Sequence, residues 1–184
     1  MHRFLSIILV FSINCVLIFN ICEAHAEDNS KSTDLILDSA EKFFISLENG
    51  EYEIVWNLLS NKSHKTIIND VHKALEKMNR DINKEDIAED FKSGGVMFNN
   101  YWSSFRSTID MEMILEHSRW KMGFIKKHKA EIIISNKKSE QPARLRMLKE
   151  NEVWKVGLVE TFWNRKRMKF MHFISNLFNK EQII

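Results

Sequence analysis

Hydrophobic and polar positions follow two different periodicities along this chain. From Thr33 to about Ser118 the apolar residues recur at spacings of three and four, which predicts helices that each bury one face. From Ala130 to Trp163 they alternate or run together over short stretches, which predicts three successive strands at residues 130–135, 143–149 and 153–162. The pattern therefore predicts an α+β fold in which helices pack on an antiparallel sheet.

Short polar and glycine-containing breaks divide the helical part. Asn49-Gly50 is a typical helix end, and the residues from Ser60 to Ser63 separate the second apolar stripe from the third. Residues 109–125 fit both periods, and we expect a helix that gives way to a strand near Ser118. The strand 153–162 is expected to be central in the sheet, with Trp154 in the core.

The first residues have the pattern of an export signal. An apolar run from Phe4 to Cys22 follows His2-Arg3 and precedes Ala24-His25-Ala26, with small residues at the two positions that a signal peptidase reads. This predicts a signal peptide at residues 1–26 and an exported, periplasmic protein. The alternative is an uncleaved inner-membrane anchor, because the run is about as long as the ~17–25 residues that a spanning helix needs.

The net charge of +2 hides a basic C-terminal segment. Residues 164–184 carry five Lys and Arg residues and one Glu, and the apolar residues Phe170, Phe173, Ile174 and Leu177 recur at helical spacing. We expect a basic amphipathic helix that docks on its own domain or on a second copy of the chain. Attachment to an anionic membrane surface is the alternative.

Two stretches resemble a known superfamily. AEKFFISLENGEYEIVWNLLS, at residues 40–60, looks like the opening of the nuclear transport factor 2-like (cystatin-like, α+β roll) superfamily. ARLRMLKENEVWKVGLVE, at residues 143–160, resembles its last two strands. The resemblance implies that residues 27–163 form one domain in which a curled, cone-shaped sheet encloses a cavity. It implies no particular activity, because this fold hosts isomerases, dehydratases, binding proteins and secretion-system scaffolds.

The best candidate for an acid–base role is Glu160. It shares a strand face with Trp154 and Phe162 in the predicted sheet, so it either points into the cavity or lies at its mouth. The simpler interpretation is a rim carboxylate paired with a Lys or Arg. Glu131 alternates away from its apolar neighbours and is expected to face solvent.

Aromatic residues at helical and strand spacing suggest either a core or an apolar pocket. The candidate ligand contacts are Tyr101, Trp102, Trp120 and Trp154. The histidines form no pair at i, i+4, and Glu116-His117 alone is a weak metal signal, so we predict neither a metal site nor a cofactor. No glycine-rich phosphate loop and no Gly-x-Ser-x-Gly elbow occur in the sequence.

These observations favour a non-enzymatic binding or accessory protein of the cell envelope. Its partner would be an apolar small molecule or another protein, and nucleic acid is not expected for an exported chain with a mildly acidic body. Two alternatives remain open: a small isomerase or dehydratase that uses Glu160, and a secretion-system assembly module held at the membrane.

Overall fold

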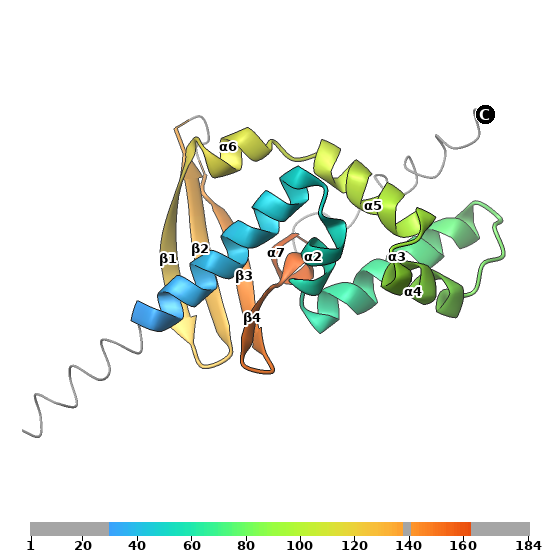
Figure 1. Cartoon of the computed structure of the whole chain (residues 1–184), viewed down its shortest axis with the longest axis horizontal. Coiled ribbons are helices and arrows are strands. Elements are labelled where there is room, and N and C mark those ends of the chain that lie inside the picture. The colour runs from blue at the N-terminus through green and yellow to red at the C-terminus, as the bar shows by residue number, and fades with distance from the viewer. Residues whose placement is uncertain (1–29, 138–140, 163–184) are drawn as a thin grey trace, which may run out of the picture. The chain divides into compact units, whose positions relative to one another are not determined.

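The chain folds as helices followed by a sheet, which confirms the predicted α+β class (Figure 1). The computed structural model describes residues 30–137 and 141–162, so the predicted signal at 1–26 and the predicted tail helix at 164–184 lie outside the described residues. The elements are the first helix (residues 30–49), α2 (Tyr52–Asn57), α3 (Asn61–Lys77), α4 (Lys84–Ser93), α5 (Val96–Ser107), α6 (Met111–Leu115), β1 (Ser118–Lys126), β2 (Lys129–Asn136), β3 (Ala143–Glu150), β4 (Val153–Val156) and α7 (Leu158–Phe162).

The chain divides after Leu35 into two units, and the core, the sheet and the cavity all belong to the second. None of the helices in the described ranges combines the length and the apolar character needed to cross a bilayer.

Local capping explains where the helices begin and end. Gly50 has φ +75°, a left-handed conformation that suits glycine, and it ends the first helix where Asn49-Gly50 predicted. The side chains of Ser60, Asn83 and Asp110 each accept a backbone N–H in the first turn of α3, α4 and α6. The short α6 then gives way to β1 at Ser118, as the mixed periodicity predicted.

The sheet is four-stranded and antiparallel, in the order β1-β2-β3-β4. Ala130, Ile132 and Ile134 on β2 are buried, and Leu145 and Met147 on β3 are buried on the same face. This is the face that the period-two pattern predicted for the core.

Residues 36–49 of the first helix lie across this core face (Figure 1). The Ser39 hydroxyl donates to the Trp154 carbonyl at 2.7 Å, and the Phe44 ring meets the Trp120 ring edge to face, with centroids 5.6 Å apart. One hydrogen bond and one ring contact thus fix the helix against opposite edges of the sheet, at β4 and β1.

A second packing region lies among α2, α3, α4 and α5. Its rings are Trp56, Phe91, Phe98, Tyr101, Trp102 and Phe105, with neighbouring centroids mostly 5 to 6.5 Å apart. His64 of α3 stacks on Trp56 at 4.0 Å, and its Nε2 lies 2.7 Å from the Trp56 carbonyl oxygen. The aromatic repeat of α5 is therefore a core face.

A short junction joins the helical part to the sheet. Val156 donates its N–H to the Leu58 carbonyl at 2.7 Å, and the Ser60 N–H donates to the Val156 carbonyl at 3.0 Å. Ser63, also buried, accepts the Val159 N–H on its hydroxyl at 3.2 Å. The chain between α2 and α3 thus runs parallel to β4 and covers the outer edge of that strand.

The prediction of a central strand from Val153 to Phe162 is wrong. β4 ends at Val156 and lies at the edge of the sheet, and Leu158–Phe162 form α7. The Gly157 N–H still bonds to the Arg146 carbonyl at 2.8 Å, as in a regular ladder. Pairing with β3 stops there because the Gly157 carbonyl accepts from Thr161 of α7, and the Arg146 N–H donates to the Thr161 hydroxyl instead. Leu158 and Val159 are both buried in this short helix.

Replacement of Trp154 should test this core. The residue is 5% exposed, so Trp154→Ala should lower the free energy of unfolding by about 3–5 kcal/mol. The measurement is urea denaturation, with Val153→Ala as the control because that neighbour is 51% exposed. Equal midpoints for the two variants would mean that the sheet does not pack as described.

Stability should also depend on pH through His64. Burial, opposed in part by the hydrogen bond to the Trp56 carbonyl, lowers the pKa of His64 from its usual 6.5, so the unfolded chain binds the proton more readily. The contribution of neutral His64 to the free energy of unfolding is fully present above about pH 6.5. It is lost as the pH falls through the lower pKa that His64 has in the folded state. Urea midpoints between about pH 7.5 and pH 5 should fall less in His64→Gln than in the parent. His128→Gln, a change in the β1–β2 turn, is the control and should keep the parent's slope.

Candidate functional site

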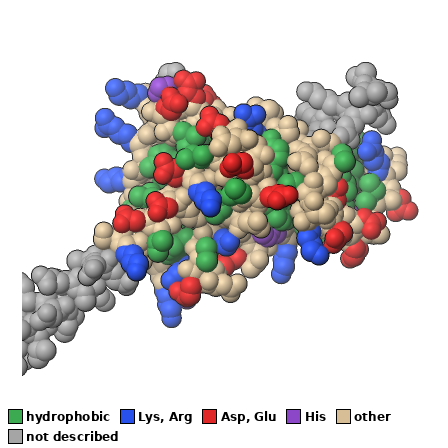
Figure 2. Space-filling model, in the orientation of Figure 1, with side chains coloured by type: hydrophobic (Ala, Val, Ile, Leu, Met, Phe, Trp, Pro, Cys, Tyr) green, Lys and Arg blue, Asp and Glu red, His purple; other side chains and the backbone are tan. Residues whose placement is uncertain are grey.

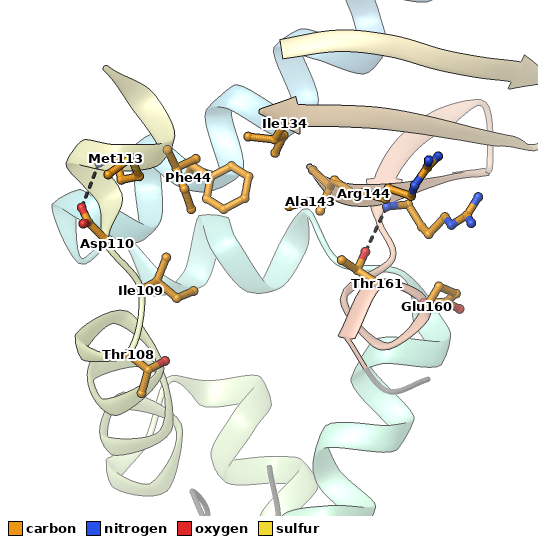
Figure 3. A pocket seen from close by; sticks show the side chains of 13 residues that line it. Phe44, Thr108, Ile109, Asp110, Met113, Ile134, Ala143, Arg144, Glu160 and Thr161 are labelled. Atoms are coloured by element: carbon orange, nitrogen blue, oxygen red, sulfur yellow. Dashed lines mark hydrogen bonds between the residues drawn. The ribbon is translucent and has the colours of Figure 1, made fainter. Parts of the chain in front are cut away.

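An apolar cavity opens between the first helix, α6, the sheet and α7 (Figure 3). Its volume is about 480 Å³, within the range of small-molecule sites. It is lined by Phe44, Thr108, Ile109, Asp110, Met113, Ile114, Ile134, Ala143, Arg144, Leu145, Arg146, Glu160 and Thr161. Figure 3 shows Phe44, Ile109 and Ile134 on one side, with Thr161 and Glu160 opposite them.

The apolar wall is held in place by contacts behind it. Phe44 is buried, and its ring is fixed edge to face by Phe43 at 5.2 Å and by Trp120 at 5.6 Å. Ile134 and Leu145 project from the core face of β2 and β3. Because these side chains are already packed from the rear, they cannot readily collapse into the space in front.

The polar rim is formed mainly by α7. Thr161 accepts the Arg146 N–H on its hydroxyl at 2.9 Å and donates to the Gly157 carbonyl at 2.7 Å, so its hydroxyl fixes α7 against β3. Glu160 lies beside it, 18% exposed at the side chain, with Oε1 3.6 Å from Lys62 Nζ. Its Oε2 is buried and has no hydrogen-bond partner within the described ranges.

The structure therefore places Glu160 at the cavity, but on a helix and not on a strand. The contact with Lys62 is the pairing expected of a rim carboxylate. A catalytic role for Glu160 stays a prediction.

The four aromatic candidates lie elsewhere. Tyr101 and Trp102 are fully buried in the helical ring cluster, and Trp154 is buried in β4. Trp120 is half-buried and lies behind the cavity wall, where its ring meets Phe44 and its Nε1–H donates to the Ile114 carbonyl at 3.1 Å. None of the four is among the described residues that line the cavity.

Glu116 and His117 gain a neighbour that sequence reasoning did not include. Glu112 lies one helical turn earlier, and the three side chains offer ligand atoms within 4.8 Å of one another. All three are exposed, and His117 Nε2 already lies 3.2 Å from Glu112 Oε1. The contact between His117 and Glu112 holds these two side chains together on the surface.

The prediction that Glu131 faces solvent is wrong. Glu131 does point away from the core, but it is only 3% exposed. Arg144 and Arg146 of β3 bind its two oxygens, with Arg144 Nη1 to Oε1 at 2.7 Å and Arg146 Nη1 to Oε2 at 2.8 Å. Register explains this, because Arg146 is directly opposite Glu131 and Arg144 is the diagonal neighbour.

A bulge in β1 makes room for this carboxylate. The pairing of β1 with β2 shifts between Met122 and Phe124, leaving Gly123 as the extra residue. A Cβ at Gly123 would lie 2.9 Å from Glu131 Oε1, so only glycine fits there without displacing the ion pair. The Phe124 ring, on the same face, has the Arg146 guanidinium 5.5 Å from its centroid.

Comparison with known proteins gives no further guidance. No protein family, curated protein or solved structure matches the chain.

Loss of the Glu131 carboxylate should destabilise the sheet. Glu131→Gln leaves two guanidinium groups without their counter-ion, and because both are 40–47% exposed they can partly recover water. We expect a loss of about 1–3 kcal/mol in the free energy of unfolding, measured by urea denaturation. Glu152→Gln removes an exposed partner of Lys149 and should leave the midpoint unchanged. Equal effects of the two changes would contradict the buried ion pair.

Proposed function

We propose that the chain is an exported, non-enzymatic binding protein of the cell envelope that holds an apolar small molecule in the cavity. The observation that carries this proposal is the cavity's lining. Its inner wall is built from Phe44, Ile109, Met113, Ile134 and Leu145, and its polar groups are confined to the rim. Such a site favours a ligand through burial of apolar surface, at about 25 cal/mol per Å².

The same proposal includes the finer description of the fold. A helix laid across the core face of a short antiparallel sheet, with a cavity at one end, supports a cone-shaped roll of the nuclear transport factor 2-like kind. The apolar run before residue 27 supports export.

A second candidate is an isomerase or dehydratase that uses Glu160, and one observation favours it. Glu160 Oε2 is buried at the cavity without a hydrogen-bond partner in the described part of the chain, so it could accept a proton from a bound substrate. Against it, Lys62 holds the other oxygen. Glu160→Gln separates the two candidates: a binding protein retains its ligand, and an enzyme loses turnover.

The binding proposal is tested by filling the cavity. Ala143 lines the cavity yet is exposed, so Ala143→Phe adds a ring there without crowding the core. Saturable binding of the neutral dye Nile red should weaken by about tenfold or more in this variant. Val153→Phe adds the same ring at an exposed position outside the cavity and should bind as the parent does.

Native mass spectrometry of protein purified from its own host complements the titration. A copurifying apolar molecule that is absent from Ala143→Phe would support the proposal. Nile red binding that is unsaturable, or unchanged in Ala143→Phe, would contradict it.

A further inference from the structure

Charge is divided between the two parts of the fold. Residues 36–117, the helical part, contain 15 Asp and Glu against 9 Lys and Arg. The sheet, residues 118–137 and 141–156, contains 10 Lys and Arg against 3 Asp and Glu. The small net charge of the body thus conceals an acidic helical part and a basic sheet.

The basic residues gather on the outer face of the sheet, opposite the first helix. Register places one set on this face, which we call the basic face: Arg119, Lys121, Lys126, Lys129, Arg144 and Arg146. Figure 2 shows a row of Lys and Arg side chains projecting from the side on which β1 lies in Figure 1. Neighbours in such a lattice are about 5 to 7 Å apart, along and across the strands.

Most of this charge is not neutralised locally. Of the acids that the strands place on this face, Glu131 has both oxygens held by Arg144 and Arg146, and Glu150, at the far end of β3, accepts the Asn61 N–H. No ion pair joins Arg119, Lys121 or Lys129 to an acid in the part of the chain that the structure describes. The ion pair with Glu131 also keeps the two arginines extended over the sheet.

The arrangement of cations and aromatic rings on the basic face indicates which kind of polyanion it would bind. Single-stranded nucleic acid is bound by a basic groove with free aromatic rings on which bases stack. Here the one ring at the centre, Phe124, already has Lys126 Nζ 5.6 Å and the Arg146 guanidinium 5.5 Å from its centroid. Cations spread over adjacent strands, without a free ring, fit a plane of phosphate head groups better than a single strand.

We propose that the basic face binds the anionic surface of a lipid membrane. Lys and Arg side chains near such a surface each strengthen binding about fivefold, and the attraction is screened by salt. The acidic helical part would orient the bound molecule. The anionic surface repels it, so the sheet turns toward the lipid. This inference is independent of the ligand cavity, which opens on the other face of the sheet.

The test is co-sedimentation of residues 27–184 with vesicles. Within the described ranges the buried core runs from Ile36 to Val159, and this form keeps all of it. The vesicles are phosphatidylcholine alone, or phosphatidylcholine with about one third phosphatidylglycerol. We expect binding only to the second kind, decreasing as NaCl is added.

The deciding variant is Arg119→Gln, Lys121→Gln and Lys129→Gln together, which should weaken the partition about a hundredfold. The matched control, Lys65→Gln, Lys73→Gln and Lys77→Gln on α3, changes the net charge equally and should leave the partition as in the parent. All six residues are exposed, so thermal midpoints should match the parent's in both.

Three results would overturn the proposal. Equal loss in both variants would mean attraction by net charge alone. Retained binding in the sheet variant would mean that another segment binds the lipid. Tighter binding of a single-stranded oligodeoxynucleotide or of poly-glutamate than of anionic vesicles, lost in the sheet variant, would assign the face to nucleic acid or to an acidic protein.

Discussion

The arrangement of this fold depends on the buried junction of Ser60 and Ser63 with the edge strand. Their hydroxyls lie 2.9 Å apart, and both residues are fully buried. The Ser60 side chain caps α3, while the Ser63 side chain accepts the Val159 N–H, so one polar pair starts two helices. Because unpaired polar groups are costly to bury, this pair holds α3 and α7 in one relative position. That position also brings Lys62 of α3 within reach of Glu160 on α7 and so sets the polar rim of the cavity.

Sequence patterns correctly predicted those features of the fold that depend on residues close together in the chain. The helix end at Gly50 depends on residues adjacent in sequence, and the burial of Ala130, Ile132 and Ile134 depends on strand periodicity. The end of β4 at Val156 could not be predicted in the same way, because the apolar residues of α7 continue the run without a polar break. What stops the strand is Thr161 of α7, which takes the Gly157 carbonyl and the Arg146 N–H, the two groups that would otherwise bond to each other across the sheet.

Glu131 shows that sequence patterns could predict the direction of a side chain but not its surroundings. Alternation correctly assigned its side chain to the face away from the core, but the outer face of a sheet is not always solvent. Its environment is set by Arg144 and Arg146, more than ten residues away, and by the bulge at Gly123. Neither the register nor the bulge can be derived from hydrophobic periodicity alone. The residues that line the cavity could not be predicted for the same reason, because they come from the first helix, α6, two strands and α7.

Strand β3 is where the two proposed surfaces meet, and its geometry keeps them apart. Ala143 and Leu145 face the cavity, whereas the side chains of Arg144 and Arg146 pair with Glu131 on the basic face. Successive side chains of a strand point to opposite faces. Residues 143–146 can therefore contribute two side chains to the cavity and the other two to the basic face. The Arg146 backbone is the mechanical link, since its N–H and carbonyl bind Thr161 and Gly157. The backbone of the strand that carries the two arginines therefore also holds α7 in place, and with it the polar rim of the cavity.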